Sequence, residues 1–192
     1  MDAAISTAEL GAAPGGETPR AEPDGDILAA IARGDRRDAL GLCARRHGAA
    51  VGRLCMALLG SQTEAEDAAQ ETLLAAHAAF ADFRSDGSLR AWLFGIARRR
   101  CARVKERRGA VRAGAEGSDE RTADELLEIR RRAERARALL ERVRPTEREA
   151  LLLRYAGELS FREVGSAAGI DEATARKRVS RALARLRELV KE

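Results

Sequence analysis

The chain has 192 residues, of which 45% are hydrophobic, 34% are charged and 3% are aromatic. Such a length can form one or two small domains with a hydrophobic core, but so few aromatic residues argue against a β-sandwich or barrel. The abundance of Ala, Leu, Arg and Glu predicts helices instead. Neither an apolar run of about 18 residues nor a signal-peptide core is present, so we expect no membrane insertion. Three cysteines without a disulfide-framework spacing indicate a reducing compartment, and we expect a cytosolic protein.

Charge is distributed in blocks, although the net charge is only +4. Residues 1–26 hold six acidic residues, one arginine and three of the four prolines, and we expect them to form a disordered acidic tail. Residues 64–82 hold five acidic residues and no Lys or Arg, whereas residues 84–108 hold nine basic residues and two acidic ones. Residues 171–192 hold seven basic residues and four acidic ones. Such blocks are typical of segments that meet different partners.

Residues 27–108 are predicted to form a first helical domain. Apolar residues recur at helical spacing up to Gly60, a typical helix C-cap. Ser61 begins a capping-box sequence and opens a helix that we expect to end near Phe80. After a polar turn, Ser88 is expected to cap another helix, which continues into the basic stretch.

A second helical domain is predicted over residues 123–192, after a small, charged and aperiodic stretch at 109–122 that we expect to be a flexible linker. Capping boxes begin at Thr146 and Ser160, and Asp171 is positioned to cap the last helix. A short helix, a glycine turn and a long basic helix follow one another, which is typical of a helix-turn-helix. The sequence therefore predicts an all-α fold of two small helical domains, the second a helix-turn-helix.

One face of the last predicted helix is basic. Its members are Thr174, Lys177, Arg178, Arg181 and Arg185. The opposite, buried stripe is predicted to consist of Val179, Leu183, Leu186 and Val190. Such a face can lie in the major groove of DNA, with its early residues on base edges and its later residues on phosphates. The alternative is a solvated amphipathic helix whose arginines serve solubility.

Four of the six aromatic residues lie close together beside the basic stretch 84–108. They are Phe80, Phe83, Trp92 and Phe94. Aromatic surfaces beside a basic groove are typical of single-stranded nucleic-acid binding. The alternative is a helical core, which we favour for Phe80, Trp92 and Phe94, whereas Phe83 at the start of the polar turn is expected to be the most exposed.

Two parts of the chain resemble bacterial sigma factors of the short, two-domain extracytoplasmic-function class, within the principal sigma family. Residues Glu64–Thr72 and Phe83–Arg98 resemble the second conserved region of that class. The fourth region is resembled by Leu151–Tyr155, Leu159–Val164, Gly169–Ile170 and Thr174–Arg181. Both motifs occur in the family's order and together cover nearly everything from residue 27 onward.

The resemblance implies a sigma factor that binds core RNA polymerase and directs initiation at promoters by recognising the −35 element and melting the −10 element. Contact with the clamp of the largest polymerase subunit is implied for Glu66, Asp67, Gln70 and Glu71, and the polymerase flap is implied as a further contact of the chain. Capture of a flipped −10 base and of the melting backbone is implied for Phe83, Arg84, Ser85, Asp86, Ser88, Trp92, Arg98, Arg99, Arg100 and Arg103. Recognition of the −35 element is implied for Arg162, Thr174, Arg176, Lys177, Arg178 and Arg181. Extruding a base costs a few kcal/mol, which stacking and pocket contacts must offset.

The same resemblance implies no enzymatic activity and no cofactor, because the polymerase makes the phosphodiester bonds, and the sequence has no catalytic constellation. It also implies an anti-sigma factor as a partner. Three positions depart from the family's pattern. His77 stands where an aromatic residue is common, and Gly165 and Ala175 replace larger core residues, so we expect looser packing of the helix-turn-helix.

Cys43, His47, Cys55 and Cys101 could ligate a metal or sense oxidants. Because Cys43 and Cys55 belong to an apolar stripe, we favour structural cysteines, and we expect His47 at the surface or at a helix end. Two other functions stay open: a free-standing helix-turn-helix regulator that binds duplex DNA as a dimer, and a redox- or metal-sensing helical adaptor. The acidic helix and the aromatic–basic segment favour the sigma factor over both.

Overall fold

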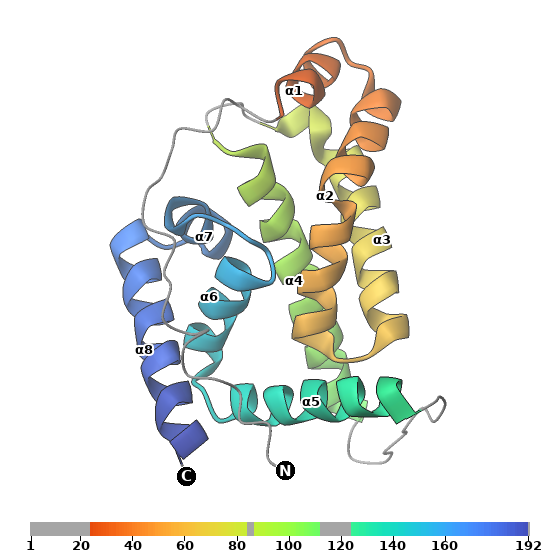
Figure 1. The fold of residues 1–192 in the computed structure, drawn as a ribbon. Coiled ribbons are helices and arrows are strands. Elements are labelled where there is room, and N and C mark those ends of the chain that lie inside the picture. The colour runs from red at the N-terminus through yellow and green to blue at the C-terminus, as the bar shows by residue number, and fades with distance from the viewer. Residues whose placement is uncertain (1–23, 84–86, 112–123, 192) are drawn as a thin grey trace.

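The computed structural model describes residues 24–83, 87–111 and 124–191, and within these ranges every regular element is a helix (Figure 1). The first domain consists of α1 (Gly25–Ala32), α2 (Arg36–Leu59), α3 (Gln62–Ala79), the 3-10 helix η1 (Phe80–Asp82) and α4 (Leu89–Val111). The second domain consists of α5 (Asp124–Glu141), α6 (Pro145–Tyr155), α7 (Phe161–Ala168) and α8 (Glu172–Lys191). The predicted all-α fold class is confirmed.

In the first domain, α2, α3 and α4 pack side by side, with α1 across the top of α2 (Figure 1). Its largest fully buried side chains include Phe80, Phe94, Ile27, Leu54 and Leu93. Burying a side chain of this size contributes about 1.5–3 kcal/mol. The prediction that Phe80 and Phe94 belong to the core is therefore confirmed.

Local sequence signals set the helix boundaries in the first domain. Gly60 ends α2 in the left-handed conformation, with φ 77°. The Ser61 hydroxyl accepts a hydrogen bond from the Glu64 amide at 3.5 Å, and the Ser88 hydroxyl accepts one from the Ala91 amide at 3.2 Å. All three predicted boundary residues therefore act as predicted.

The helix-turn-helix of the second domain is formed by α7 and α8. Ser160 and Glu163 form the predicted capping box at the start of α7. Gly169 ends this helix with φ 70°, and the Asp171 carboxylate accepts a hydrogen bond from the Thr174 amide at 2.8 Å at the start of α8. The turn and both caps are as predicted.

Packing of the helix-turn-helix differs from the expectation at Gly165. A Cβ at this position would lie 2.7 Å from the Ile170 carbonyl oxygen. The absence of a side chain therefore permits a close approach of the backbone and is not a packing defect, so the expected looser packing is wrong at this residue. Ala175 is fully buried.

Two further expectations for the second domain are wrong. The helix α6 begins at Pro145, one residue before the predicted cap Thr146, and it has no side-chain cap. Proline fits the first helical position because its φ is preset and it lacks the amide hydrogen that would be unpaired there. At the end of α8, Leu189 is 4% exposed whereas Val190 is 53% exposed, so Val190 does not belong to the buried stripe.

The described structure begins inside the stretch predicted to be an acidic tail. Asp24 is buried, and its carboxylate lies 2.8 Å from Nε2 of His47, whereas Asp26 receives two hydrogen bonds from the Arg46 guanidinium. His47 is 5% exposed in the middle of α2, so its expected surface position is wrong. Burial alone would raise the pKa of the Asp24 carboxyl, but hydrogen bonds and the charges of His47 and Arg46 hold it below its usual value.

The other predicted boundaries can be compared only in part. The helix α4 ends at Val111, three residues into the predicted linker 109–122. Residues 1–23 and 112–123 lie outside the described residues.

Candidate nucleic-acid interface

The outer face of α3 carries the four side chains predicted to contact the polymerase. Glu66, Asp67, Gln70 and Glu71 are all exposed. The opposite face of the helix is buried through Ala65, Ala68, Thr72 and Ala76. Leu74, one turn after Gln70, is 56% exposed. This face of α3 therefore combines carboxylates with an exposed apolar side chain.

An arginine-rich hollow lies beside α3. The Glu71 carboxylate is 3.6 Å from the Arg100 guanidinium of α4. A hollow of about 200 Å³ between the two helices is lined by Ala75, Ala79, Trp92, Ile96, Arg99, Arg100 and Arg103. Burial and the adjacent charges of Arg98 and Arg103 lower the pKa of Arg99. Since these like charges repel one another, an anion in the hollow would be favoured.

Trp92 is supported by two aromatic neighbours at the edge of this hollow. Its ring centroid lies 5.0 Å from that of Phe83 and 6.0 Å from that of Phe80. Both Trp92 and Phe83 are half-buried, so Trp92 is less buried than the predicted core position and Phe83 is less exposed than expected. Three predicted contacts of the turn, Arg84, Ser85 and Asp86, lie outside the described residues.

The structure does not bring all the predicted −10 residues to one surface. Ser88 and Arg98 face the second domain instead of the hollow. The Ser88 hydroxyl donates a hydrogen bond to the Glu163 carboxylate at 2.9 Å, and Arg98 donates one to the Ala167 carbonyl at 3.2 Å. The predicted set is therefore divided between a group at the hollow and two residues that contact α7, of which Ser88 is exposed and Arg98 is half-buried.

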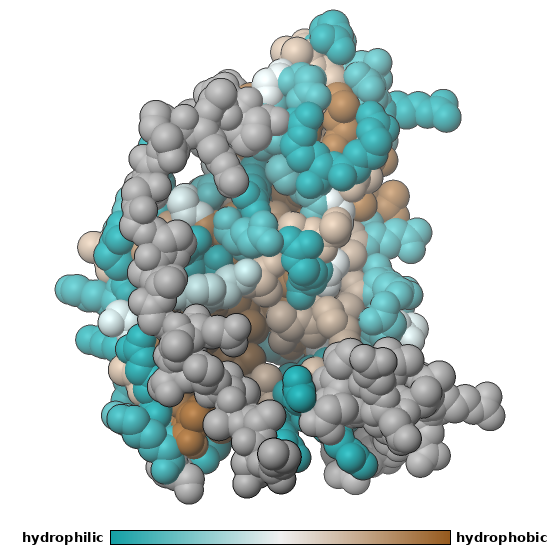
Figure 2. All heavy atoms as spheres, viewed as in Figure 1, coloured by the Kyte–Doolittle hydropathy of each residue, from teal (hydrophilic) through white to brown (hydrophobic). Residues whose placement is uncertain are grey.

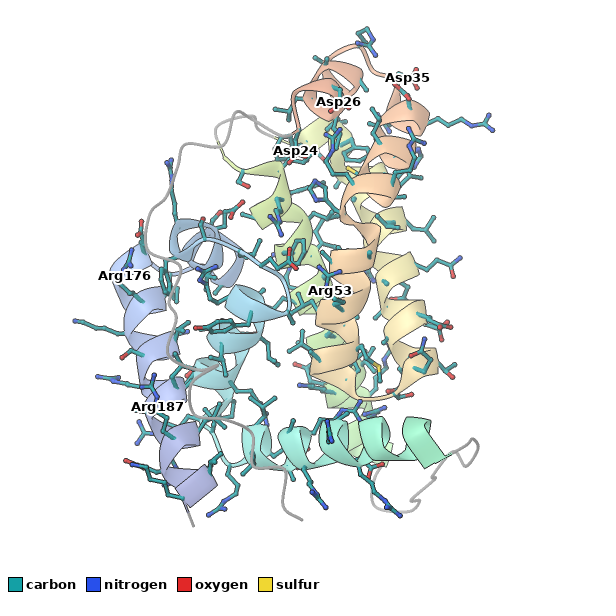
Figure 3. All side chains as sticks on the ribbon, viewed as in Figure 1. Asp24, Asp26, Asp35, Arg53, Arg176 and Arg187 are labelled. Carbon is teal, nitrogen blue, oxygen red and sulfur yellow. The ribbon has the colours of Figure 1, made fainter. Side chains whose placement is uncertain are left out.

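Basic side chains line the outer side of α8. Arg176, Lys177 and Arg181 are exposed, and Thr174 and Arg178 are half-buried. Figure 3 labels Arg176 near the start of α8 and Arg187 further along the same helix, and Figure 2 shows hydrophilic residues along this edge. The sixth predicted −35 residue, Arg162, is exposed on α7.

Internal contacts orient the first turns of this basic face. The Thr174 hydroxyl donates to the Asp171 carboxylate at 2.6 Å. Arg176 pairs with Glu172 at 2.6 Å, and its guanidinium lies 4.3 Å from the centroid of the Phe161 ring. Stacking on an aromatic ring fixes the plane of a guanidinium and so restricts the side chain that presents it.

Two of the three cysteines meet in the core of the first domain. Cys55 of α2 and Cys101 of α4 are hydrogen-bonded, which raises the pKa of the former and lowers that of the latter. Burial raises the pKa of Cys43 to about 11. All three are buried, and the described part of the chain holds no group of three or more His, Cys, Asp and Glu side chains that could bind a metal ion. This arrangement agrees with structural thiols.

Sequence reasoning missed Arg53 and Arg90. Arg53 pairs with Glu158, and Arg90 donates to the Gly157 carbonyl. Because each partner is more than 60 residues away in sequence, no local sequence pattern could indicate these contacts.

No helix in the described ranges is long and apolar enough to span a membrane.

Comparison with known families matches both domains. The model of Sigma-70 region 2 matches residues 43–111, and that of Sigma-70, region 4, matches residues 133–186. The RNA polymerase sigma factor CnrH of Cupriavidus metallidurans is 29% identical over 177 residues, which cover 85% of this chain and 93% of that protein. The ECF RNA polymerase sigma factor EcfG of Rhodopseudomonas palustris is 32% identical over 141 residues, which cover 70% of this chain and 76% of that protein.

Solved structures with the same fold include two complexes. CnrH in complex with the cytosolic domain of CnrY has a TM-score of 0.69 and 26% identity, and it covers 86% of this chain and 96% of that one. The sigma factor RpoE of Bartonella quintana, in complex with the anti-sigma factor NepR, has a TM-score of 0.58 and 26% identity. The match covers 82% of this chain and 97% of that one.

Both domains, in the order region 2 then region 4, define a two-domain protein of the Sigma-70 class. This chain belongs to the extracytoplasmic-function (ECF) sigma factors. It binds core RNA polymerase and promoter DNA and directs promoter-specific transcription initiation. Sigma factors are regulatory, non-catalytic proteins. A free-standing regulator or a redox adaptor would not account for the match to region 2.

Proposed function

We propose that the acidic face of α3 is the contact with the polymerase clamp, through Glu66, Asp67, Gln70 and Glu71. All four side chains are exposed, and α6–α8 lie on the other side of α2 and α4 (Figure 1). The exposed Leu74 adds apolar area next to the charges. Complementary charge steers association, and a central apolar contact limits dissociation. Contact of the second domain with the polymerase flap completes the proposed docking.

The −10 element is proposed to bind along α4 and the turn before it. The ten residues proposed for this contact are Phe83, Arg84, Ser85, Asp86, Ser88, Trp92, Arg98, Arg99, Arg100 and Arg103. Supporting this proposal, the hollow joins an indole ring to three guanidinium groups, a combination suited to stacking a base and holding its phosphates. Stacking contributes about 1–3 kcal/mol per base and offsets the cost of melting.

The −35 element is proposed to bind the basic face of the helix-turn-helix. Its contacts are Arg162, Thr174, Arg176, Lys177, Arg178 and Arg181. The early residues of α8 would read base edges in the major groove, and the later ones would hold phosphates. The segregation of charge carries the whole proposal: carboxylates occupy the outside of α3, and arginines occupy α4 and the outside of α8.

An alanine triple variant at Arg99, Arg100 and Arg103 tests the proposed −10 contact. With core polymerase, it should co-elute normally but fail to make the promoter reactive to permanganate, which detects unpaired thymines. The matched control replaces three exposed arginines of α2, Arg36, Arg37 and Arg45, and should melt the promoter as the wild type does. Normal melting by the first variant would reject the assignment.

Regulation by an anti-sigma factor is proposed from the two solved relatives, since CnrH and RpoE are each bound to another protein, NepR being an anti-sigma factor. Because the chain acts with RNA polymerase, we place it in the cytoplasm and assign it no enzymatic reaction of its own. Pull-down with core polymerase from the cytoplasmic fraction tests this location.

A further inference from the structure

An aromatic ring lies beside the basic face of α8. Phe161, the first residue of α7, is half-buried, and its ring centroid lies 4.3 Å from the Arg176 guanidinium. A guanidinium within about 6 Å of a ring centroid is attracted by the negative face of the ring. Within the described part of α8, Arg176 is the basic residue that makes such a contact. The ring therefore acts on a proposed −35 contact, although Phe161 is not itself one of the proposed contacts.

The start of α7 is fixed by its capping box. The Ser160 amide donates to the Glu163 carboxylate at 2.9 Å, and the Glu163 amide donates to the Ser160 hydroxyl at 3.3 Å. Leu159, directly before the cap, is fully buried. Phe161 follows the cap directly, and its ring packs against the hydrophobic core. The fold consequently holds this ring in place before any DNA is bound.

The close approach of α7 and α8 at Gly165 brings Arg176 to this ring. A Cβ at Gly165 would lie 3.3 Å from the Glu172 amide nitrogen, so the two backbones nearly touch there. Phe161 is four residues before Gly165, and Arg176 is four residues after Glu172. Since four residues are about one helical turn, the ring and the guanidinium each lie one turn away from the same crossing point. Figure 3 shows Arg176 near the start of α8, beside α7.

A second contact, with Glu172, also restricts Arg176. The Arg176 guanidinium donates to the Glu172 carboxylate at 2.6 Å, one turn earlier in α8. An exposed i, i+4 pair of this kind changes an equilibrium only about twofold, so by itself it fixes the side chain weakly. The ring adds a restraint on the plane of the guanidinium. Because a guanidinium has five N–H donors, the bond to Glu172 leaves donors for DNA.

Another guanidinium, that of Arg154 from α6, lies at the same ring. It is 5.1 Å from the Phe161 centroid, and it donates to the Leu159 carbonyl at 2.9 Å. Arg154 is half-buried, whereas Arg176 is exposed. The two cations at the ring therefore differ in role: Arg154 ties the ring to the loop before α7, and Arg176 extends into solvent.

We propose that Phe161 is a positioning residue for recognition of the −35 element. Its ring holds Arg176 in a conformation that suits a base edge, so the arginine loses less side-chain freedom when α8 enters the major groove. Arg176 is the fifth residue of α8, within the early part of a recognition helix that contacts base edges. The inference rests on the proposed assignment of Arg176 to the −35 element.

A double-mutant cycle with holoenzyme tests this proposal. The probe is a promoter that the wild-type holoenzyme selects from a random library, and the readout is its affinity divided by that of the same promoter with a scrambled −35 element. Phe161→Leu keeps an apolar side chain but removes the ring, and it should lower this ratio about two- to fivefold. In a chain that already carries Arg176→Ala, the same change should have no further effect. Equal losses in the two backgrounds would overturn the proposal.

Two further variants separate positioning from a purely structural role. Phe161→Tyr keeps the ring and should retain the wild-type ratio, whereas a ratio as low as that of Phe161→Leu would overturn the proposal. Tyr155→Leu is the matched control, because Tyr155 is 54% exposed and lies 5.9 Å from the Arg154 guanidinium instead of at Arg176, and it should leave the ratio unchanged. Comparing two promoters with the same protein cancels any change in the folded fraction. If Arg176→Ala alone left the ratio unchanged, the proposed −35 assignment of Arg176 would be rejected together with the positioning role.

Discussion

Two faces of the first domain differ in what covers them. The outer face of α3 presents its carboxylates to solvent, whereas the inner face of α4 is covered by α7 and the loop before it. The arginines of α4 are consequently divided, with Arg98 bonded to the Ala167 carbonyl of α7 and Arg99 and Arg103 exposed. The difference therefore separates a face of α3 that is free to meet a partner from a face of α4 that already contacts the second domain.

Charge reversal on α3 is expected to have the largest effect of the changes considered, and the effect is on binding to core polymerase. Asp67→Lys with Glu71→Lys should weaken binding to core polymerase by at least about 100-fold, because like charges across an interface cost several kcal/mol. Size-exclusion co-elution and competition binding measure the loss, and circular dichroism checks the fold. The same reversal at Asp38 and Glu106, which are exposed elsewhere in the first domain, should change binding little. Unchanged binding of the α3 variant would mean that the docking helix is misassigned.

The second largest effect is expected in the reading helix. Arg178→Ala should cost about 1–3 kcal/mol and relax the preference at one position of the −35 element, if this residue reads a base. Selection from a promoter library with holoenzyme measures both. Arg187→Ala, further along the exposed side of α8, is the control and should leave base preferences unchanged. A uniform loss across all sequences for Arg178→Ala would make it a phosphate contact instead.

Packing of the helix-turn-helix can be tested at Gly165. Replacing Gly165 by Ala should destabilise the second domain by about 1–3 kcal/mol, because the new Cβ would meet the Ile170 carbonyl at 2.7 Å. Urea unfolding measures the change. Gly52→Ala, with open space around the new Cβ, should instead stabilise the chain by up to about 1 kcal/mol. A neutral Gly165→Ala would show that the turn relaxes without cost.

The smallest effect is expected on the pH dependence of stability, through the ion pair between Asp26 of α1 and Arg46 of α2. The hydrogen bond from Arg46 holds the pKa of Asp26 at about 2, below its usual 3.8. Because the pKa is lower in the folded chain, the ion pair stabilises the fold above about pH 4, and this stabilisation is lost as the pH falls towards 2. Asp26→Asn should therefore flatten the decline in stability between pH 5 and 2, measured by urea unfolding. Asp82→Asn is the control, and an equal flattening there would contradict the role of Arg46.

Much of the fold could be predicted because its signals are local. Ser61, Ser88, Ser160 and Asp171 each act on an amide three residues away, so their caps follow from short sequence patterns. The prediction at Thr146 was wrong because the neighbouring proline begins the helix first. Local patterns thus fix helix ends unless an adjacent residue has a stronger preference.

Long-range contacts could not be predicted in this way. Asp24 pairs with His47, which lies 23 residues further along the chain. Because Asp24 belongs to an acidic, proline-rich stretch, its sequence context predicts a solvated tail instead of a buried pair. The contact between the two domains depends on the carbonyls of Gly157 and Ala167, and a carbonyl has no signature in sequence. The basic face of α8 could be predicted because helical periodicity places Thr174, Lys177 and Arg181 on one side, whereas the acidic group of α3 followed from the resemblance to sigma factors.

The positions of α4 and α8 when the polymerase opens a promoter decide whether the two domains read two separate elements. A photo-cross-linking amino acid at Arg98 in one variant and at Arg178 in another, each assembled with core polymerase, measures both positions on the DNA. We expect cross-links at two sites about 25 base pairs apart, the first to a melted strand and the second to duplex. Cross-links within one helical turn of each other, or none from Arg98, would contradict the account.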